Sequence, residues 1–307
     1  MWFKNLMIYS FTEQFTFDNK ALEEALENGR FSPCGSQELS SYGWTAPAGR
    51  HSENLQHSGS GFILLCARKE ERILPASVIK DFVNERVTVI EEEQLRKVRK
   101  KERDEIKDEV LLELTPKAFT RSSFTYGLLA PELGYLLVDA GSAKKADDFT
   151  AYLRKSLGSL PVKPVSVNEA PVALFTAWLD GKLSPPDDLT IGEECELNAS
   201  DDEGGVVRLS RHQLTDSDEI KTHLAAGKLV VKLGLEWQDS LSFVLDNELG
   251  VKKLRFSDTL QEQAAEDGSA DAAAEFDAQF TLSSLELAKF VPRLIEIFGG
   301  LQNAEGR

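Results

Sequence analysis

The sequence predicts an α+β fold in which antiparallel sheets are backed by helices. Two observations predict it. Apolar runs of strand length follow one another in the last third of the chain, and in the middle a hairpin is followed directly by a capped helix. The chain has 307 residues, of which 41% are hydrophobic. That length allows two domains or one large elaborated domain, with a sizeable core that needs no disulfides.

The first sixty-odd residues predict short strands around one helix. Residues 2–17 mix apolar and polar side chains as a strand does, and residues 19–28 form an amphipathic helix with Leu22 and Leu26 on one face. The Gly-, Ser- and Pro-rich residues 32–61 read as an ordered loop with short strands, because Trp44 gives them a group to bury. Residues 62–67 (FILLCA) have the length of a buried strand.

A single long helix is predicted from Pro75, at its first position, to about Leu114. Ile79, Val83 and Val87 recur at helical spacing. Between residues 91 and 107 the apolar side chains almost vanish, so we expect this stretch to be exposed around most of its circumference.

A β-hairpin is predicted from residues 126–130 and 134–139, joined through Pro131 and Glu132. Ser142 has the side chain and the position to cap a helix over residues 143–157. Gly158 ends that helix.

The last third predicts a second group of antiparallel strands. These strands are residues 206–209, 228–237, 240–245 and 251–256. A helix over residues 216–226 is capped by Thr215. Residues 262–277, rich in Ala, Asp and Glu, predict a mobile acidic loop. Ser284 begins the last helix, which Gly299 and Gly300 terminate.

Composition excludes several classes of protein. The three cysteines are too few and too scattered for a disulfide framework, which fits a reducing compartment. The first ten residues do not form a signal peptide, and no apolar run reaches the length of a membrane span. We therefore expect a cytoplasmic protein without a membrane partner. The formal net charge of −16 opposes a nucleic-acid partner at first sight, because a polyanion repels an acidic chain.

Catalytic signals are weak. The sequence contains no phosphate-binding loop, dinucleotide fingerprint, zinc-protease motif, paired-cysteine motif or nucleophile elbow. Cys34 and His51 lie in one Gly- and Ser-rich region and are the one candidate nucleophile pair, but nothing in the spacing supplies a third, orienting group. The prediction is therefore no enzyme, no catalytic residue and no metal.

The feature with defined geometry is a cationic stripe on the predicted long helix. At 3.6 residues per turn its side chains fall within an arc of about 100°. Its members are Arg96, Arg99, Lys100, Arg103 and Lys107. Glu102, Glu105 and Glu109 lie on roughly the opposite side. Such a stripe suits a phosphate backbone, although charge runs of this type are usually solvated helix faces held by i,i+4 pairs.

The distribution of charge along the chain favours a stripe that contacts a phosphate backbone over a solvated helix face. Residues 68–107 carry 12 Lys and Arg against 10 Asp and Glu, whereas residues 193–290 carry 9 against 21. The chain is therefore polarised rather than uniformly acidic. Net charge alone does not exclude a nucleic-acid partner.

Seven stretches along the chain resemble the bacterial recombination-associated protein RdgC family. They are WFKNL (2–6), FSPCGSQ (31–37), CARKEERILP (66–75), KDEVLLELTPKAF (107–119), SAKKADD (142–148), LRKSLGSLPV (153–162) and AGKLVVKLGLEWQ (226–238). The resemblance implies crescent-shaped subunits that close a ring-shaped homodimer around double-stranded DNA. It also implies binding with little sequence preference, antagonism of RecA, a link to replication-fork repair, association with the nucleoid, no catalysis and no cofactor.

The resemblance also assigns individual residues. Arg211 and His212 match a finger-tip pair that contacts or gates DNA, with His in place of an amide. Phe119 matches an aromatic residue at a subunit interface; its alternative is an ordinary core Phe. We expect a central region (1–165), a finger or tip region (166–235) and a C-terminal region that packs back on the core (236–307).

Two classes of function remain open from the sequence. The first is the sequence-independent duplex-DNA binder with its stripe facing the DNA. The second is an acidic adaptor for basic proteins, in which the charged helix is merely solvated and contacts no DNA. A hydrolase that uses Cys34 and His51 is a third, separate alternative.

Overall fold

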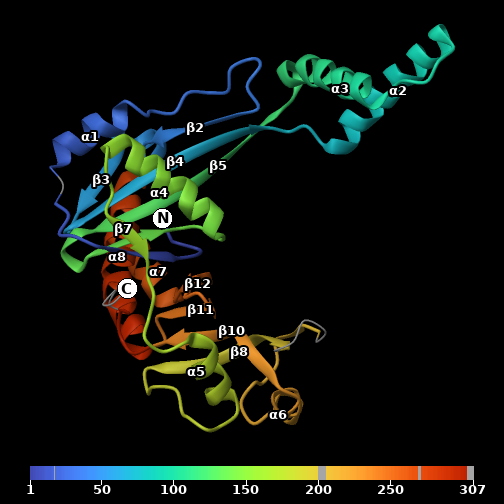
Figure 1. Ribbon diagram of the computed structural model, residues 1–307. Coiled ribbons are helices and arrows are strands. Elements are labelled where there is room, and N and C mark those ends of the chain that lie inside the picture. The colour runs from blue at the N-terminus through green and yellow to red at the C-terminus, as the bar shows by residue number, and fades with distance from the viewer. Residues whose placement is uncertain (17, 200–204, 269–270, 303–307) are drawn as a thin grey trace. The chain divides into compact units, whose positions relative to one another are not determined.

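The computed structural model describes residues 1–16, 18–199, 205–268 and 271–302. Within these residues it contains eight α-helices and twelve strands in two sheets (Figure 1). The strand pairing is antiparallel, which confirms the predicted α+β class. The chain divides into two compact units, Met1–Leu26 with Ala46–Cys66 and Thr125–Arg307, and Glu27–Thr45 with Ala67–Phe124. None of the described helices is long and apolar enough to cross a membrane.

The first sheet contains the predicted hairpin. Its strand order is β2 (Ser40–Thr45), β4 (Phe62–Arg72), β5 (Thr120–Ala130), β6 (Tyr135–Val138), β1 (Met7–Phe11) and β7 (Val162–Pro164), with β3 (Gln56–Gly59) also paired to β4. Gly127 lies opposite Val138 and Ala130 opposite Tyr135, and the short turn Pro131–Leu133 connects the strands. The prediction for this hairpin is confirmed.

Helix α4 (Ala143–Leu157) begins and ends where the sequence indicates. The Ser142 side chain accepts a hydrogen bond from the backbone N–H of Lys145, and Gly158 follows the last turn with a φ of 78°. Fully buried Phe149 packs on the sheet at Gly127, where a Cβ atom would approach its ring to 2.4 Å. Helix α1 (Asn19–Glu27) buries Leu22 and Leu26 as predicted.

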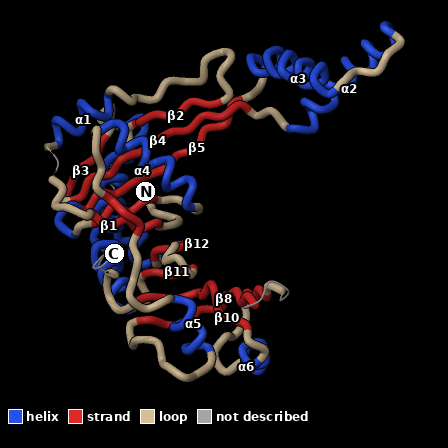
Figure 2. Tube along the Cα trace, in the orientation of Figure 1, coloured by secondary structure: helices blue, strands red, loops and turns tan. Residues whose placement is uncertain are grey.

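The second sheet contains the predicted C-terminal strands and one that the sequence did not reveal. Its order is β12 (Val251–Phe256), β11 (Leu241–Asp246), β10 (Lys228–Trp237), β8 (Leu189–Ala199) and β9 (Val207–Ser210). Figure 2 labels β8, β10, β11 and β12 of this sheet. Strand β8 is rich in glutamate, which hides its buried Leu189 and Leu197. Helix α5 (Pro171–Leu179) packs on this sheet. Helix α6 (Asp218–Ala225) begins after Ser217, not after Thr215 as predicted.

The predicted acidic loop at residues 262–277 is wrong. Helix α7 (Asp258–Asp267) and the start of helix α8 (Ala272–Ile297) account for its described residues. The Asp271 carboxylate accepts hydrogen bonds from the N–H groups of Ala273 and Ala274, and the alanines and glutamates that follow favour a helix. Ser284 is therefore a buried residue inside α8 and not its beginning.

Within the first unit, helix α8 packs against strands of both sheets. Near its start the Phe280 ring lies against His57 of β3, with ring centroids 4.7 Å apart. Two turns and more further along, Phe290 contacts Trp237 and Phe243 of the second sheet. The core of this unit is therefore continuous from one sheet to the other.

The predicted single helix from Pro75 to Leu114 is also wrong. The segment folds as two helices that lie side by side, α2 (Ala76–Gln94) and α3 (Lys100–Leu114) (Figure 1). Leu95 breaks the helix with a left-handed backbone, φ 51°. The Glu91 carboxylate then closes the turn by accepting hydrogen bonds from the N–H of Val98 and the Nζ of Lys97.

The hairpin has a small core of its own. Val83 and Val87 of α2 pack against Ile106 and Val110 of α3. Val83 and Val87 are two of the residues whose helical spacing predicts a helix in this segment. A continuous helix would leave both apolar stripes in water, so the fold back on itself buries them against each other.

Candidate nucleic-acid interface

The packing of α3 on α2 determines where the cations of α3 point. Ile106 and Val110 face α2. Lys100, Arg103 and Lys107 then fall within an arc of about 60° along one edge of the helix. The opposite edge carries Glu102, Glu105 and Glu109. We call the three basic residues the α3 cationic edge.

The members of this edge differ in how they are held. Lys100 and Lys107 are exposed and have no carboxylate partner among the described residues. Arg103 donates a hydrogen bond to the side-chain oxygen of Asn84 in α2. Because Asn84 is uncharged, this bond does not neutralise the positive charge of Arg103. Two unpaired ammonium groups and one positioned guanidinium therefore line this edge.

Two residues of the predicted stripe do not belong to it. Arg96 lies in the turn between the helices and donates hydrogen bonds of 2.7 and 2.5 Å to the two carboxylate oxygens of Glu102. Those bonds lower the pKa of Glu102, so the pair stays charged and its two charges offset each other. Arg99 is the residue before the first turn of α3, with an extended backbone. The arc calculated for a continuous helix does not apply to either residue.

Phe119 is not a core residue. Its side chain is 84% exposed, in the short connection between the turn Thr115–Lys117 and β5. Its carbonyl accepts a hydrogen bond from the N–H of Ile73, which is itself half exposed. The core alternative for Phe119 is therefore wrong, and the residue presents an aromatic ring to solvent.

Arg211 and His212 follow β9 in the first unit. Arg211 is exposed, adopts a left-handed backbone with φ 55°, and has no ion-pair partner among the described residues. The backbone N–H of His212 donates to the carbonyl of Glu193. Its ring Nε2 lies 3.3 Å from the Ser217 hydroxyl and 3.8 Å from the Glu219 carboxylate. His212 is thus held in place, whereas Arg211 is free to reach outward.

Sequence reasoning missed two cations near Arg211. Arg211, Lys253 and Arg255 line one hollow on the second sheet. Lys253 pairs with Glu194 at 2.5 Å, and Arg255 has no ion-pair partner in the described part of the chain. Their strand, β12, alternates exposed cations with buried Leu254 and Phe256, a pattern that signals a strand and no function.

The candidate nucleophile Cys34 has the wrong electrostatics for nucleophilic chemistry. Burial raises the pKa of its thiol, and the neighbouring Glu70 carboxylate raises that pKa further. Burial also raises the pKa of Cys66 to about 12 and that of Cys195 to about 11. A thiolate nucleophile needs the opposite shift. Among the described residues, no group of three or more His, Cys, Asp or Glu side chains is arranged to hold a metal ion.

Together these features define a mixed α+β protein with two antiparallel sheets and a helical hairpin that carries a cationic edge. Comparison with known proteins identifies the family. A family model described as "Putative exonuclease, RdgC" matches residues 1–301. The chain belongs to the RdgC family.

The relatives agree over the full length. The recombination-associated protein RdgC of Pseudomonas paraeruginosa strain PA7 is 51% identical over 307 residues, which is 100% of both chains. The protein of the same name from Pseudomonas aeruginosa strain PAO1 is 50% identical, and that from Pseudomonas fluorescens strain Pf0-1 is 47% identical, again over 100% of both chains. The family description and the relatives' names thus differ, one referring to an exonuclease and the other to recombination.

Proposed function

We propose that this protein binds double-stranded DNA without sequence preference and thereby restrains RecA-mediated recombination, in connection with replication-fork repair. The observation that carries the proposal is the α3 cationic edge, in a chain whose relatives are recombination-associated proteins. Lys100 and Lys107 are seven residues, or about 10 Å, apart along the helix. That separation spans about three nucleotides of one DNA strand.

Backbone contacts of this kind carry no sequence information. Lysine and arginine side chains neutralise phosphates and release counterions, whatever the bases are. Exposed Arg211, with His212 fixed beside it, supplies a second contact in this proposal. Arg96 is not proposed as a DNA contact while it is paired with Glu102. Arg99 lies directly before α3, and no DNA contact is proposed for its side chain.

The proposal includes assembly as a ring. Two crescent-shaped subunits would close around the duplex as a homodimer, with Phe119 at a subunit interface. The 84% exposure of that ring supports an interface, because a large aromatic side chain gains free energy when a partner covers it. The three-region organisation (1–165, 166–235 and 236–307) and the location, cytoplasmic and associated with the nucleoid, belong to the same proposal.

Charge distribution supports this arrangement. Most of the excess negative charge lies in residues 193–290. An acidic outer surface would repel DNA from the wrong faces, and long-range fields of this kind steer association. The net charge of −16 is then compatible with a DNA partner.

The second candidate is an acidic adaptor that binds basic proteins. The observation that favours it is the pairing of hairpin cations with carboxylates, Arg96 with Glu102 and Lys97 with Glu91. In that case the α3 cationic edge would be solvated and would contact no DNA.

A salt titration distinguishes the two candidates. For the DNA binder, the logarithm of affinity for a long mixed-sequence duplex should fall linearly with the logarithm of salt, with a slope of about −0.9 per neutralised phosphate. A K100E/R103E/K107E variant should lose affinity for all sequences about equally. The matched control, K4E/K20E/R50E, changes the net charge by the same amount at exposed positions outside the hairpin and should retain more affinity. Absence of binding at low salt, or equal losses in both variants, would reject this interface.

We also propose that the protein has no catalytic activity and needs no cofactor. The raised thiol pKa of Cys34 removes the one nucleophile that the sequence indicated. Incubation of the full chain with end-labelled duplex and Mg²⁺ should leave the DNA intact at protein concentrations that saturate binding. Shortening of the labelled strands would instead support the exonuclease description.

A further inference from the structure

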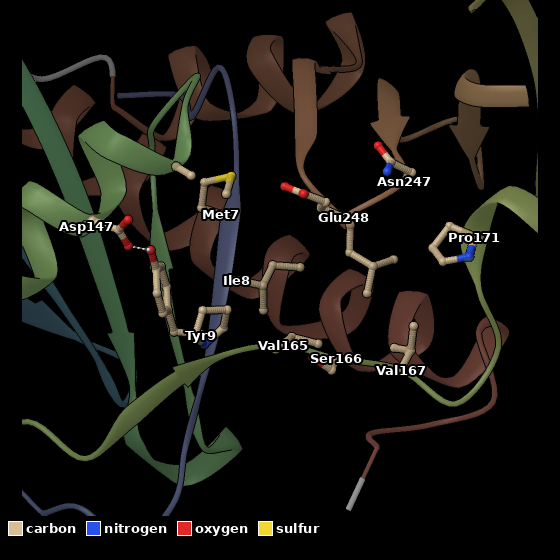
Figure 3. A pocket seen from close by; sticks show the side chains of 13 residues that line it. Met7, Ile8, Tyr9, Asp147, Val165, Ser166, Val167, Pro171, Asn247 and Glu248 are labelled. Carbon is tan, nitrogen blue, oxygen red and sulfur yellow. Dashed lines mark hydrogen bonds between the residues drawn. The ribbon is translucent and has the colours of Figure 1, made fainter. Parts of the chain in front are cut away.

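The first unit contains a pocket that the proposed DNA contact does not use. Its volume is about 430 Å³, and five segments line it: β1, the start of α4, residues 164–167 at and after β7, the first residue of α5, and the turn between β11 and β12 (Figure 3). A dry cavity of about 150 Å³ is enough for benzene. This pocket therefore has room for an alkyl chain together with a polar head group.

The inner wall of the pocket is apolar and already formed. Ile8, Val165 and Leu249 line it and are each more than nine-tenths buried. The backbone N–H of Val165 donates to the carbonyl of Ile8 at 3.0 Å, which holds two walls together. A pocket built in this way needs no rearrangement to accept methylene groups.

One side of the pocket ends in an oriented carboxylate. The Tyr9 ring is 5% exposed, and its hydroxyl donates a hydrogen bond of 3.2 Å to Oδ1 of Asp147 (Figure 3). Burial, and then the Asp147 charge, raise the pKa of Tyr9 to about 12. The phenol therefore stays a donor at neutral pH and holds Asp147 at the mouth.

A second carboxylate comes from the turn between β11 and β12. Oδ1 of Asp246 accepts hydrogen bonds from the N–H groups of Glu248 and Gly250, at 3.0 and 2.7 Å. Leu249 adopts a left-handed backbone, φ 60°, and is buried. With the turn fixed in this way, Leu249 lies in the pocket wall and Glu248 is exposed. The carboxylate end of Glu248 is directed toward Met7 (Figure 3).

Both mouth carboxylates lack a cation. Among the described residues, neither Asp147 nor Glu248 has an ion-pair partner. A cation near the pocket wall is Lys252, whose Nζ lies 3.6 Å from the Sδ of Met7 and pairs with Asp246 at 3.6 Å. Asp246 offsets the charge of Lys252, so the two mouth carboxylates leave the mouth with an excess of negative charge that favours a cation over DNA phosphate.

We propose that this pocket binds an aliphatic cation, an ammonium or guanidinium group on an alkyl stem. The stem would lie on Ile8, Val165 and Leu249, and the head would lie between Asp147 and Glu248. This chemistry occurs in free alkyl amines and in the Lys or Arg side chains of a peptide. The site is separate from the α3 cationic edge, so the inference does not depend on the proposed function.

The test uses probes of matched shape. Calorimetric titration of the full chain at low salt should show hexylammonium binding about fivefold or more tighter than 1-hexanol, since one charge pair at a partly exposed site contributes about that factor. A D147N/E248Q variant should remove the preference for the cation and keep the weak binding of the alcohol. Tyr9 can still donate to an amide oxygen at position 147, so the variant is expected to fold.

Two further variants make the result specific. E13Q/D148N removes the same two charges at exposed positions that do not line the pocket and should keep the preference. Ala143→Leu fills the mouth and should weaken both probes. Equal affinity for the two probes, no binding of either, or an undiminished preference in D147N/E248Q would overturn the proposal.

A peptide arm identifies the source of the cation. Acetyl-Gly-Lys-Gly-amide carries the same ammonium on a four-carbon stem. If it binds and loses affinity in D147N/E248Q, the site takes a side chain of a partner protein. If only hexylammonium does so, the site takes a free amine. If neither probe responds to the double substitution, the proposal fails while the DNA titration above is unaffected.

Discussion

Arg96 and Glu102 form a two-point hydrogen-bonded ion pair across the turn that joins α2 to α3, with distances of 2.7 and 2.5 Å. The pair connects the residue after the left-handed Leu95 to the first turn of α3. It therefore fixes the geometry of the turn and removes one cation from those available to a ligand. Arginine and carboxylate groups favour this planar arrangement.

Substitution of Glu102 should make the Arg96 side chain available for binding to DNA. In Glu102→Gln the guanidinium of Arg96 loses its counter-charge and becomes available to phosphate. Affinity for duplex DNA should rise at low salt, and the slope of log affinity against log salt should steepen by about one unit. Fluorescence anisotropy over a range of salt concentrations measures both.

The converse variant is the control. Arg96→Gln should change the affinity of the otherwise intact protein little, since Glu102 already neutralises this side chain. A loss of affinity in Arg96→Gln as large as that in Lys100→Gln would mean that Arg96 contacts DNA despite its partner.

Local signals explain which elements the sequence predicted well. Helix α4 is bounded by Ser142 and Gly158, and the β5–β6 hairpin by Pro131 and Gly134. Capping and turn formation depend on residues within four positions, so a linear sequence reports them. The break at Leu95 carries no such signal, because it contains neither glycine nor proline. It follows from the burial of Val83 and Val110 against each other, which is a tertiary effect.

The candidate site was predictable in part for the same reason. Lys100, Arg103 and Lys107 share an edge of α3 because helical periodicity holds within one helix. Arg96 was assigned to that edge on the assumption of a continuous helix. Its pairing with Glu102, six residues away, occurs only across a turn. The pocket beside Tyr9 and Asp147 draws on five segments and has no linear signature.

Removal of the exposed aromatic ring at position 119 tests the interface. Phe119→Ser should shift the proposed homodimer toward monomer in sedimentation velocity, because a buried aromatic side chain contributes about 1.5–3 kcal/mol at an interface. The thermal midpoint of the monomer should barely change, since the ring is 84% exposed in the single chain. An unchanged sedimentation coefficient would remove Phe119 from any interface.

The close approach of α4 to the first sheet predicts a large effect from one methyl group. A Cβ atom at residue 127 would lie 2.4 Å from the fully buried ring of Phe149. Gly127→Ala should therefore reduce the free energy of unfolding by about 1–3 kcal/mol through overpacking. Urea denaturation measures the loss. Gly141→Ala, whose Cβ would meet Asn5 only at ordinary contact distances, should change stability little, and equal effects of the two variants would contradict the packing argument.

The hydrogen bonds of Asp188 predict how the stability of the protein changes in acid. Its carboxylate accepts hydrogen bonds of 2.8 and 3.0 Å from Arg293 of α8 and one of 3.3 Å from the Trp237 indole. The bonds from Arg293, and then that from Trp237, lower the pKa of Asp188. The ionised form is thus favoured in the folded protein. Its contribution to stability is complete above the ordinary Asp pKa of about 3.9 and is lost as the pH falls through the lower folded value.

Asp188→Asn should therefore destabilise the protein by about 1–2 kcal/mol at pH 7, the range for hydrogen bonds to a partly exposed charged group. Its difference from the unsubstituted protein should shrink as the pH falls below about 4, because both chains then lack the charge. Urea midpoints between pH 7 and pH 3 measure this convergence. Glu296→Gln, at the exposed second partner of Arg293, should show a smaller difference at pH 7. A difference for Asp188→Asn that stays constant down to pH 3 would show that the ion pair does not stabilise the attachment of α8.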